Sequence, residues 1–199
     1  METLVIRADS SVAMGSGHVM RCIALSQAWQ DAGGQVTFLS ASPTDVARRR
    51  LAAEGIELVE TAARPGSETD AKDLVALARR LGAPWVVVDG YAFGGPYQRA
   101  LREAGQRQLV IDDNGDADHY WCELVLNQNI HADESFYAAR EGHTELLLGT
   151  RYSLLRREFR RLSPLRREIP PVARKLLITL GGSDPDNCTE KIIRALKPG

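Results

Sequence analysis

The sequence has no long apolar run, little excess of charge of either sign, and few cysteines. Its apolar runs are short, as in residues 85–88, whereas a membrane-spanning helix needs roughly 20 apolar residues. The formal net charge of -1 gives no general reason to expect DNA or RNA as a partner. The chain does not open with a basic segment followed by an apolar one, so we expect neither a signal peptide nor a membrane partner.

The three cysteines, Cys22, Cys122 and Cys188, are odd in number and widely spaced. This spacing favours neither a disulfide framework nor a zinc site, and it fits a protein of the reducing cytoplasm. We expect no cofactor. Hydrophobic residues make up 44% and charged residues 26% of the chain, which is typical of a folded domain and not of disorder. With 199 residues, the chain is long enough for one packed domain and some additional structure.

Short apolar segments alternate with helical patterns along the chain. We expect strands over 4–6, 36–39, 56–59, 85–88, 109–111 and 124–126, and helices over 18–32, from 42, 70–81 and 96–104. Strands that are apolar on both faces and alternate with helices predict an α/β, Rossmann-like fold with a covered parallel sheet. Ligands of such folds bind at the carboxyl ends of the strands. The loops after the first, fourth and fifth strands are therefore the candidate sites.

The character of the chain changes after residue 150. Residues 1–150 form the predicted catalytic domain, and residues 151–174 are basic and end in two prolines, which indicates a helix and a linker. Residues 175–199 contain a predicted strand over 175–180 and a helix over 187–196. One strand and one helix cannot bury a core, so we expect the start of a truncated second domain.

The glycine loop Gly15-Ser16-Gly17 precedes the first helix, which begins near His18. Free N–H groups and the positive end of a helix dipole make such a loop suitable for a phosphate group. The dinucleotide-binding pattern fails because Met20 stands where its third glycine belongs. The Walker A and nucleophile-elbow patterns are also absent.

His18 itself has two interpretations: a structural hydrogen bond at a helix end, or a general base. A helix N-terminus disfavours the imidazolium ion, so a neutral histidine at the ligand end of a strand could accept a proton. The acidic segment 112–118 could be a metal loop, but its spacing does not match a calcium loop. We expect a polar turn there, in which strand-end aspartates bond to nearby backbone, and no metal.

Seven segments, in this order, resemble one family of nucleotide-sugar enzymes: 7–9, 15–22, 89–91, 112–113, 126–129, 149–159 and 180–185. The chain is similar to the UDP-2,4-diacetamido-2,4,6-trideoxy-altropyranose hydrolases of pseudaminic acid synthesis, which are related to spore-coat polysaccharide proteins. More distantly, it resembles peptidoglycan glycosyltransferases of the two-domain architecture called GT-B. The resemblance implies that residues 1–150 are the N-terminal domain of a GT-B-type fold.

The resemblance also implies roles for individual residues. It suggests a metal-independent hydrolysis of the bond between the sugar and UDP, in which His18 activates water. The implied substrate contacts are Gly15, Gly17, Arg21, Tyr91 and Arg156, and the implied nucleotide-binding loop is Gly181, Gly182 and Ser183. Arg21 could instead face solvent, and Arg156 could belong to a solvated basic face. One departure is Gly90, where the family often has histidine.

Two alternatives to the hydrolase remain at this stage. A glycosyltransferase would use the same base to deprotonate an acceptor hydroxyl, and a non-catalytic module would only bind the nucleotide sugar. We expect the 199-residue chain to fold in its N-terminal part yet to lack hydrolase activity alone, because a cleft between two domains needs both walls to position the reacting groups.

Overall fold

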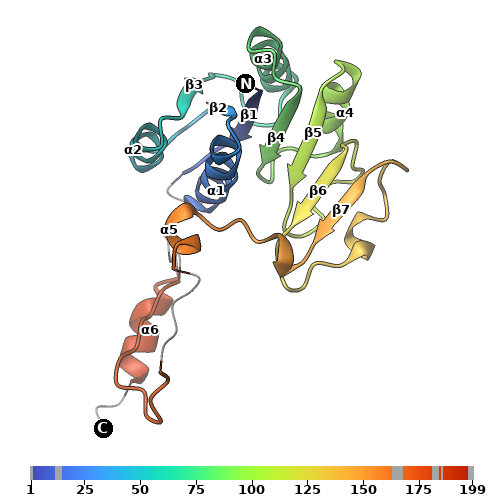
Figure 1. Ribbon diagram of the computed structural model, residues 1–199. Helices are drawn as coiled ribbons and strands as arrows, with labels where there is room; N and C mark the ends of the chain where they lie inside the picture. The colour runs from blue at the N-terminus through green and yellow to red at the C-terminus, as the bar shows by residue number, and fades with distance from the viewer. Residues whose placement is uncertain (1, 12–14, 163–167, 181–183, 185, 197–199) are drawn as a thin grey trace.

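The computed structural model describes residues 2–11, 15–162, 168–180, 184 and 186–196. Its centre is a parallel sheet of seven strands in the order β3-β2-β1-β4-β5-β6-β7 (Figure 1). The predicted α/β, Rossmann-like fold is therefore confirmed. The strands are β1 (Thr3–Ala8), β2 (Gln35–Ser40), β3 (Glu57–Glu60), β4 (Trp85–Asp89), β5 (Arg107–Ile111), β6 (Leu124–Asn127) and β7 (Glu145–Leu148).

Four helices cover the two faces of this sheet. The helices α1 (Gly17–Asp31) and α2 (Asp45–Ala53) pack on one face, and α3 (Glu68–Arg80) and α4 (Gly95–Glu103) on the other. Successive side chains of a strand point to opposite faces. Along β4, Val86 and Val88 therefore join the core under α3 and α4, while Val87 joins the core under α1 and α2. These two cores explain why the strands are apolar on both faces.

The order of the strands reverses at β1. The chain passes from β1 to β2 and β3 on one side, and then returns to pair β4 with the other side of β1. The register places Ala8, the last residue of β1, beside Asp89, the last residue of β4. In open α/β sheets, ligands bind in the crevice at such a reversal point. The loops after β1 and β4 therefore meet where the fold class provides a site.

The sheet also differs from the sequence expectation in places. The helix expected from residue 42 starts at Asp45, because the side chain of Thr44 accepts the hydrogen bond of Ala47 N at 3.3 Å and caps it. Strand β7 and the short 3-10 helices η1 (Glu134–Tyr137) and η2 (Thr150–Tyr152) were not predicted. Within the described part of the chain, no helix is long and apolar enough to cross a membrane.

After β7 the chain returns across the carboxyl edge of the sheet to α1. Leu154 N donates to Gln128 Oε1 at 2.8 Å on the way. The one-turn helix α5 (Arg157–Arg160) then docks on α1, where Arg157 N donates to Gln27 Oε1 at 2.6 Å and its guanidinium pairs with Asp31 at 2.7 Å. Among the described residues between 151 and 174, where a helix was expected, the α-helical part is this single turn.

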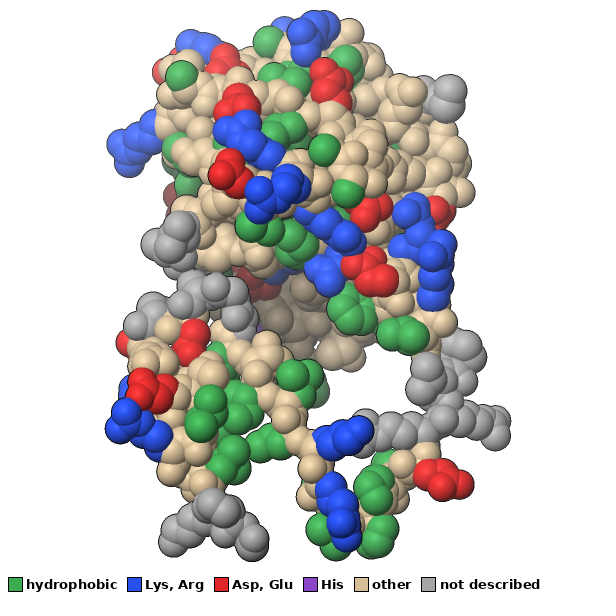
Figure 2. Space-filling model, turned by 90° about the vertical axis from the view of Figure 1, so that its left-hand side faces the viewer, with side chains coloured by type: hydrophobic (Ala, Val, Ile, Leu, Met, Phe, Trp, Pro, Cys, Tyr) green, Lys and Arg blue, Asp and Glu red, His purple; other side chains and the backbone are tan. Residues whose placement is uncertain are grey.

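Beyond α5 the chain leaves the domain as an extension that ends in α6 (Cys188–Ala195) (Figure 1). The expected helix near 187–196 is present, but the strand expected over 175–180 is not assigned. A strand needs a neighbour to pair with its backbone groups, and these residues pair with no strand among the described ones. Apolar side chains of the extension are exposed and gather on it in Figure 2; they are Ile169, Val172, Leu176, Leu177, Leu180, Ile192, Ile193 and Leu196.

A buried ion cluster ties the end of β1 to α3. Arg7 is fully buried, and its guanidinium contacts Asp9 at 2.8 Å and Asp70 at 2.8 Å. Burial opposes the charge of Arg7, but the two carboxylates outweigh it and raise the pKa of Arg7. Asp70 also accepts the backbone N–H of Gly66 at 2.8 Å. The cluster therefore joins the first strand, the third helix and the loop that leads into it.

We predict that Asp70→Asn lowers the free energy of unfolding by roughly 1–3 kcal/mol, because a neutral amide replaces one of the two carboxylates that accept from the buried Arg7. Urea denaturation followed by circular dichroism measures this loss. The matched control is Glu68→Gln on the same helix, whose partner Lys72 is exposed. We expect no measurable change for the control, and equal effects of the two variants would contradict the structural importance of the cluster.

Candidate active site

His18 lies in the first turn of α1 and is only 7% exposed. Its Nδ1 is 2.7 Å from Oδ1 of Asp89. An ionised carboxylate can only accept a hydrogen bond, so Nδ1 must donate and the neutral ring has its lone pair on Nε2. Nε2 has no hydrogen-bond partner within the described ranges. This arrangement presents a nitrogen that can accept a proton.

The start of α1 also leaves backbone donors uncapped. The side chain of Ser16, the N-cap residue, makes no capping hydrogen bond, and the first turn contains no acidic residue. The position of a Cβ atom on Gly17 has no other atom within 4 Å, so the backbone can be approached there. The positive end of the helix favours anions and a neutral imidazole. These features agree with the expectation from the glycine loop, in which Gly15 adopts a φ of 77°.

Asp89 is fully buried and receives four donors. Besides His18, Arg21 donates twice, at 2.6 Å to Oδ1 and 2.7 Å to Oδ2, and the Cys22 thiol donates to Oδ2 at 3.2 Å. Burial and the charge of Asp89 raise the pKa of Cys22 well above its ordinary value, so the thiol keeps its proton. The buried carboxylate is thus paired and fixed in orientation. In the sequence, residues 89–91 stand out only through a family resemblance, which implies no role for Asp89.

Arg21 faces the interior of the site and not bulk solvent. In addition to Asp89, its Nη1 contacts both oxygens of Asp113, at 2.7 and 2.8 Å. Burial opposes ionisation of Asp113, but Arg21 outweighs that effect and lowers the pKa of Asp113. The expected substrate contact by Arg21 therefore competes with two carboxylates of the protein itself.

The acidic segment after β5 forms a turn around Asp112, as predicted. Its carboxylate accepts the backbone N–H groups of Asn114, Gly115 and Asp116 at 2.8, 2.6 and 3.1 Å. It also accepts the Tyr120 hydroxyl at 2.7 Å. The part of the chain that the structure describes contains no group of three metal-ligating side chains placed to hold an ion.

Tyr91 lies above His18 in the loop after β4. The two rings meet edge to face with centroids 5.0 Å apart, and Tyr91 is 59% exposed. The preceding Gly90 has a φ of 147°, and a Cβ there would lie 3.1 Å from the Phe93 ring. A histidine at position 90 would therefore strain this backbone. A cavity of about 10 Å³ beside His18 is on the scale of one water molecule; its lining is His18, Arg21, Gly90, Tyr91, Ile111, Asp112, Asp113 and Asp116.

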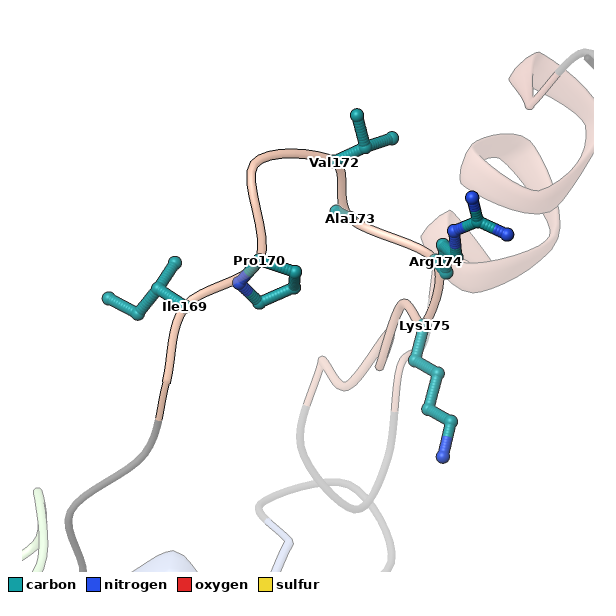
Figure 3. Close-up of a pocket in the computed structure, with 6 residues that line it drawn as sticks. All are labelled: Ile169, Pro170, Val172, Ala173, Arg174 and Lys175. Atoms are coloured by element: carbon teal, nitrogen blue, oxygen red, sulfur yellow. The ribbon is translucent and has the colours of Figure 1, made fainter.

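Arg156, another expected site residue, makes its contacts away from this cluster. The guanidinium of Arg156 pairs with Glu158 at 2.9 Å and lies over the Phe159 ring. Gly181, Gly182 and Ser183 lie outside the described residues. A cavity of about 390 Å³ exists in the extension, but one exposed segment lines it and its side chains splay apart (Figure 3). The described residues that line it include no carboxylate, imidazole, hydroxyl or thiol group, so it offers no comparable chemistry.

Comparison with known proteins finds similarity over nearly the whole chain. No protein-family model matches it. UDP-2,4-diacetamido-2,4,6-trideoxy-beta-L-altropyranose hydrolase of Campylobacter jejuni is 26% identical over 201 residues, which cover 97% of this chain and 65% of that protein. An uncharacterized protein of Methanocaldococcus jannaschii is 24% identical over 198 residues, covering 97% of this chain and 39% of that protein. The chain therefore spans less than two thirds of the length of each of these curated relatives.

Two solved structures are similar to part of the chain. MurG of Acinetobacter baumannii is 18% identical with a TM-score of 0.48, covering 67% of this chain and 43% of that one. A UGT transferase of Siraitia grosvenorii in complex with UDP is 16% identical with a TM-score of 0.41, covering 58% of this chain and 29% of that one.

We predict that the neutral ring of His18 is protonated at Nδ1, because that nitrogen faces a carboxylate. Long-range ¹H–¹⁵N correlation spectra of the imidazole side chains measure this directly. His119 is an internal control of opposite sense, because its Nε2 lies 3.0 Å from Glu141 and should hold the proton. An Nε2-protonated His18 would contradict the interpretation of the Asp89 contact.

Proposed function

We propose that this chain contains the catalytic half of a UDP-sugar hydrolase, which cleaves UDP from a UDP-linked 2,4-diacetamido-2,4,6-trideoxy sugar. The observation behind the proposal is the contact of His18 with Asp89 at the reversal point of the sheet, which leaves Nε2 free to act as a base. The sequence similarity to the Campylobacter hydrolase over 97% of the chain supports the choice of substrate class.

In the proposed reaction, Nε2 of His18 removes a proton from water. The water oxygen attacks the anomeric carbon of the sugar and forms the new C–O bond. The bond between that carbon and the diphosphate oxygen breaks, and UDP leaves with the bonding electrons. Asp89 stabilises the imidazolium that forms, so the charge develops beside a fixed counter-ion.

The remaining assignments complete the proposed site. The backbone of Gly15 and Gly17 approaches the substrate at the helix start, with Tyr91 beside the sugar. Residues 151–174 form the crossing to a second domain that begins at 175, as in a GT-B-type enzyme. There, Gly181, Gly182 and Ser183 bind the diphosphate, and Arg156 reaches the substrate from the crossing segment.

We predict that His18→Asn in the full-length protein slows UDP release by about 10²–10⁴-fold, because asparagine cannot accept the proton. Substrate affinity should stay close to that of the wild type, since the size and polarity of the side chain are retained. The assay follows UDP release from the diacetamido UDP-sugar, and calorimetry measures binding. His119→Asn is the control, as it removes another carboxylate-paired histidine and should leave the rate unchanged. Activity of His18→Asn within tenfold of wild type would contradict the general-base role.

A reaction in ¹⁸O-labelled water separates the proposed hydrolysis from its alternatives. We predict that the label enters the sugar product and not UDP, because water attacks carbon and not phosphorus. Mass spectrometry of both products measures this. UDP release that requires an added acceptor would instead identify a glycosyltransferase, and binding without any release would identify a non-catalytic module.

A further inference from the structure

The guanidinium of Arg21 joins the ends of two strands. Its Nε and Nη2 contact Asp89 at 2.7 and 2.6 Å, while Nη1 contacts Asp113 at 2.7 and 2.8 Å. The side chain is only 12% exposed. Its donors are therefore occupied by carboxylates of the protein, and little of the group remains for a substrate.

Asp113, one of the two carboxylate partners of Arg21, is itself held by other residues. Asn129 donates to Asp113 Oδ1 at 2.8 Å, and the Asn127 side chain donates to the backbone carbonyl of Asp113 at 3.0 Å. Asn127 also donates to the Tyr137 hydroxyl at 2.8 Å. Arg21 therefore connects β4 to a rigid network at the ends of β5 and β6, and this network fixes where Asp89 can lie.

Arg21 also lies beside the imidazole. Its Nη2 is 3.2 Å from Nδ1 of His18, so its positive charge opposes protonation of the ring. The charged or titratable groups that face His18 come from α1, from the end of β4 and its loop, and from the loop after β5; they are Arg21, Asp89, Tyr91, Asp112, Asp113 and Asp116. Four of these six are carboxylic acids, which favour imidazolium, and Arg21 is the cation among them.

We propose that Arg21 is a positioning residue, which holds Asp89 against Nδ1 of His18 and offsets part of the carboxylate charge around the ring. This inference deepens the proposed hydrolase and rests on its use of His18 as the base. Without Arg21, the ionisable groups left beside the ring would be mainly carboxylates, which favour the imidazolium form that has no lone pair on Nε2.

The test is a side-chain NMR titration of the substrate-free protein. In Arg21→Gln we expect the midpoint of His18 to rise by at least about one pH unit, because a cation next to the ring is removed. Arg21→Lys keeps a cation beside the ring, so the rise of the His18 midpoint should be smaller in that variant. Asp113→Asn removes a carboxylate and should lower the midpoint. Arg99→Gln, an exposed arginine on α4 paired with Glu103, is the control and should leave it unchanged.

A matching pH–rate profile separates positioning from a merely structural role. In Arg21→Gln the acidic limb of UDP release should move to higher pH by the same amount as the midpoint, with much of the rate recovered above it. A uniform loss at every pH, or an unchanged His18 midpoint, would overturn the inference. Circular dichroism reports whether each variant is folded. If Arg21→Gln fails to fold, Arg21→Lys is measured in its place, and an unchanged His18 midpoint together with an unchanged rate would overturn the inference.

The two proposals fail in distinguishable ways. A shifted His18 midpoint in a protein that releases no UDP rejects the hydrolase and leaves the charge balance around His18 established. UDP release that depends on His18, with no shift in Arg21→Gln, rejects the role of Arg21 and keeps the hydrolase.

Discussion

The parallel pairing of β1 with β4 is the constraint on which the rest of the site depends. It makes β1 the point where the strand order reverses, and its register places Ala8 beside Asp89. The helix after β1 then begins within reach of the carboxylate that ends β4. Without this pairing His18 would be an ordinary helix-terminal histidine, with no group to select its tautomer.

Charge is buried on both sides of this pairing, and each buried charge has a partner. Arg7 lies between Asp9 and Asp70 at the end of β1, and Arg21 bridges carboxylates at the ends of β4 and β5. Buried ions are costly to place in a protein interior and very costly to leave single. The charged groups at the carboxyl ends of these strands are consequently fixed in position. In such an environment a proton can be transferred with little rearrangement of the protein.

More of the fold than of the candidate site could be predicted from the sequence. Apolar runs such as residues 85–88 predict strands buried on both faces, and the loops after the first, fourth and fifth strands do meet. His18 was found from its glycine loop, but the role of Asp89 was not, because its contact with a residue 71 positions away is set by strand register. Strand β7 escaped prediction because it is a short, half-buried edge strand. Ser42 and Thr44 can both cap a helix, and only the backbone geometry selects Thr44.

The return of the chain to α1 has a mechanical consequence. That helix has 15 residues and behaves as a rod about 22 Å long. Its first turn bears the imidazole, and its last turn is bonded through Gln27 and Asp31 to the segment that leaves the domain. A displacement of that segment would therefore act on the end of α1 opposite to the turn that bears His18.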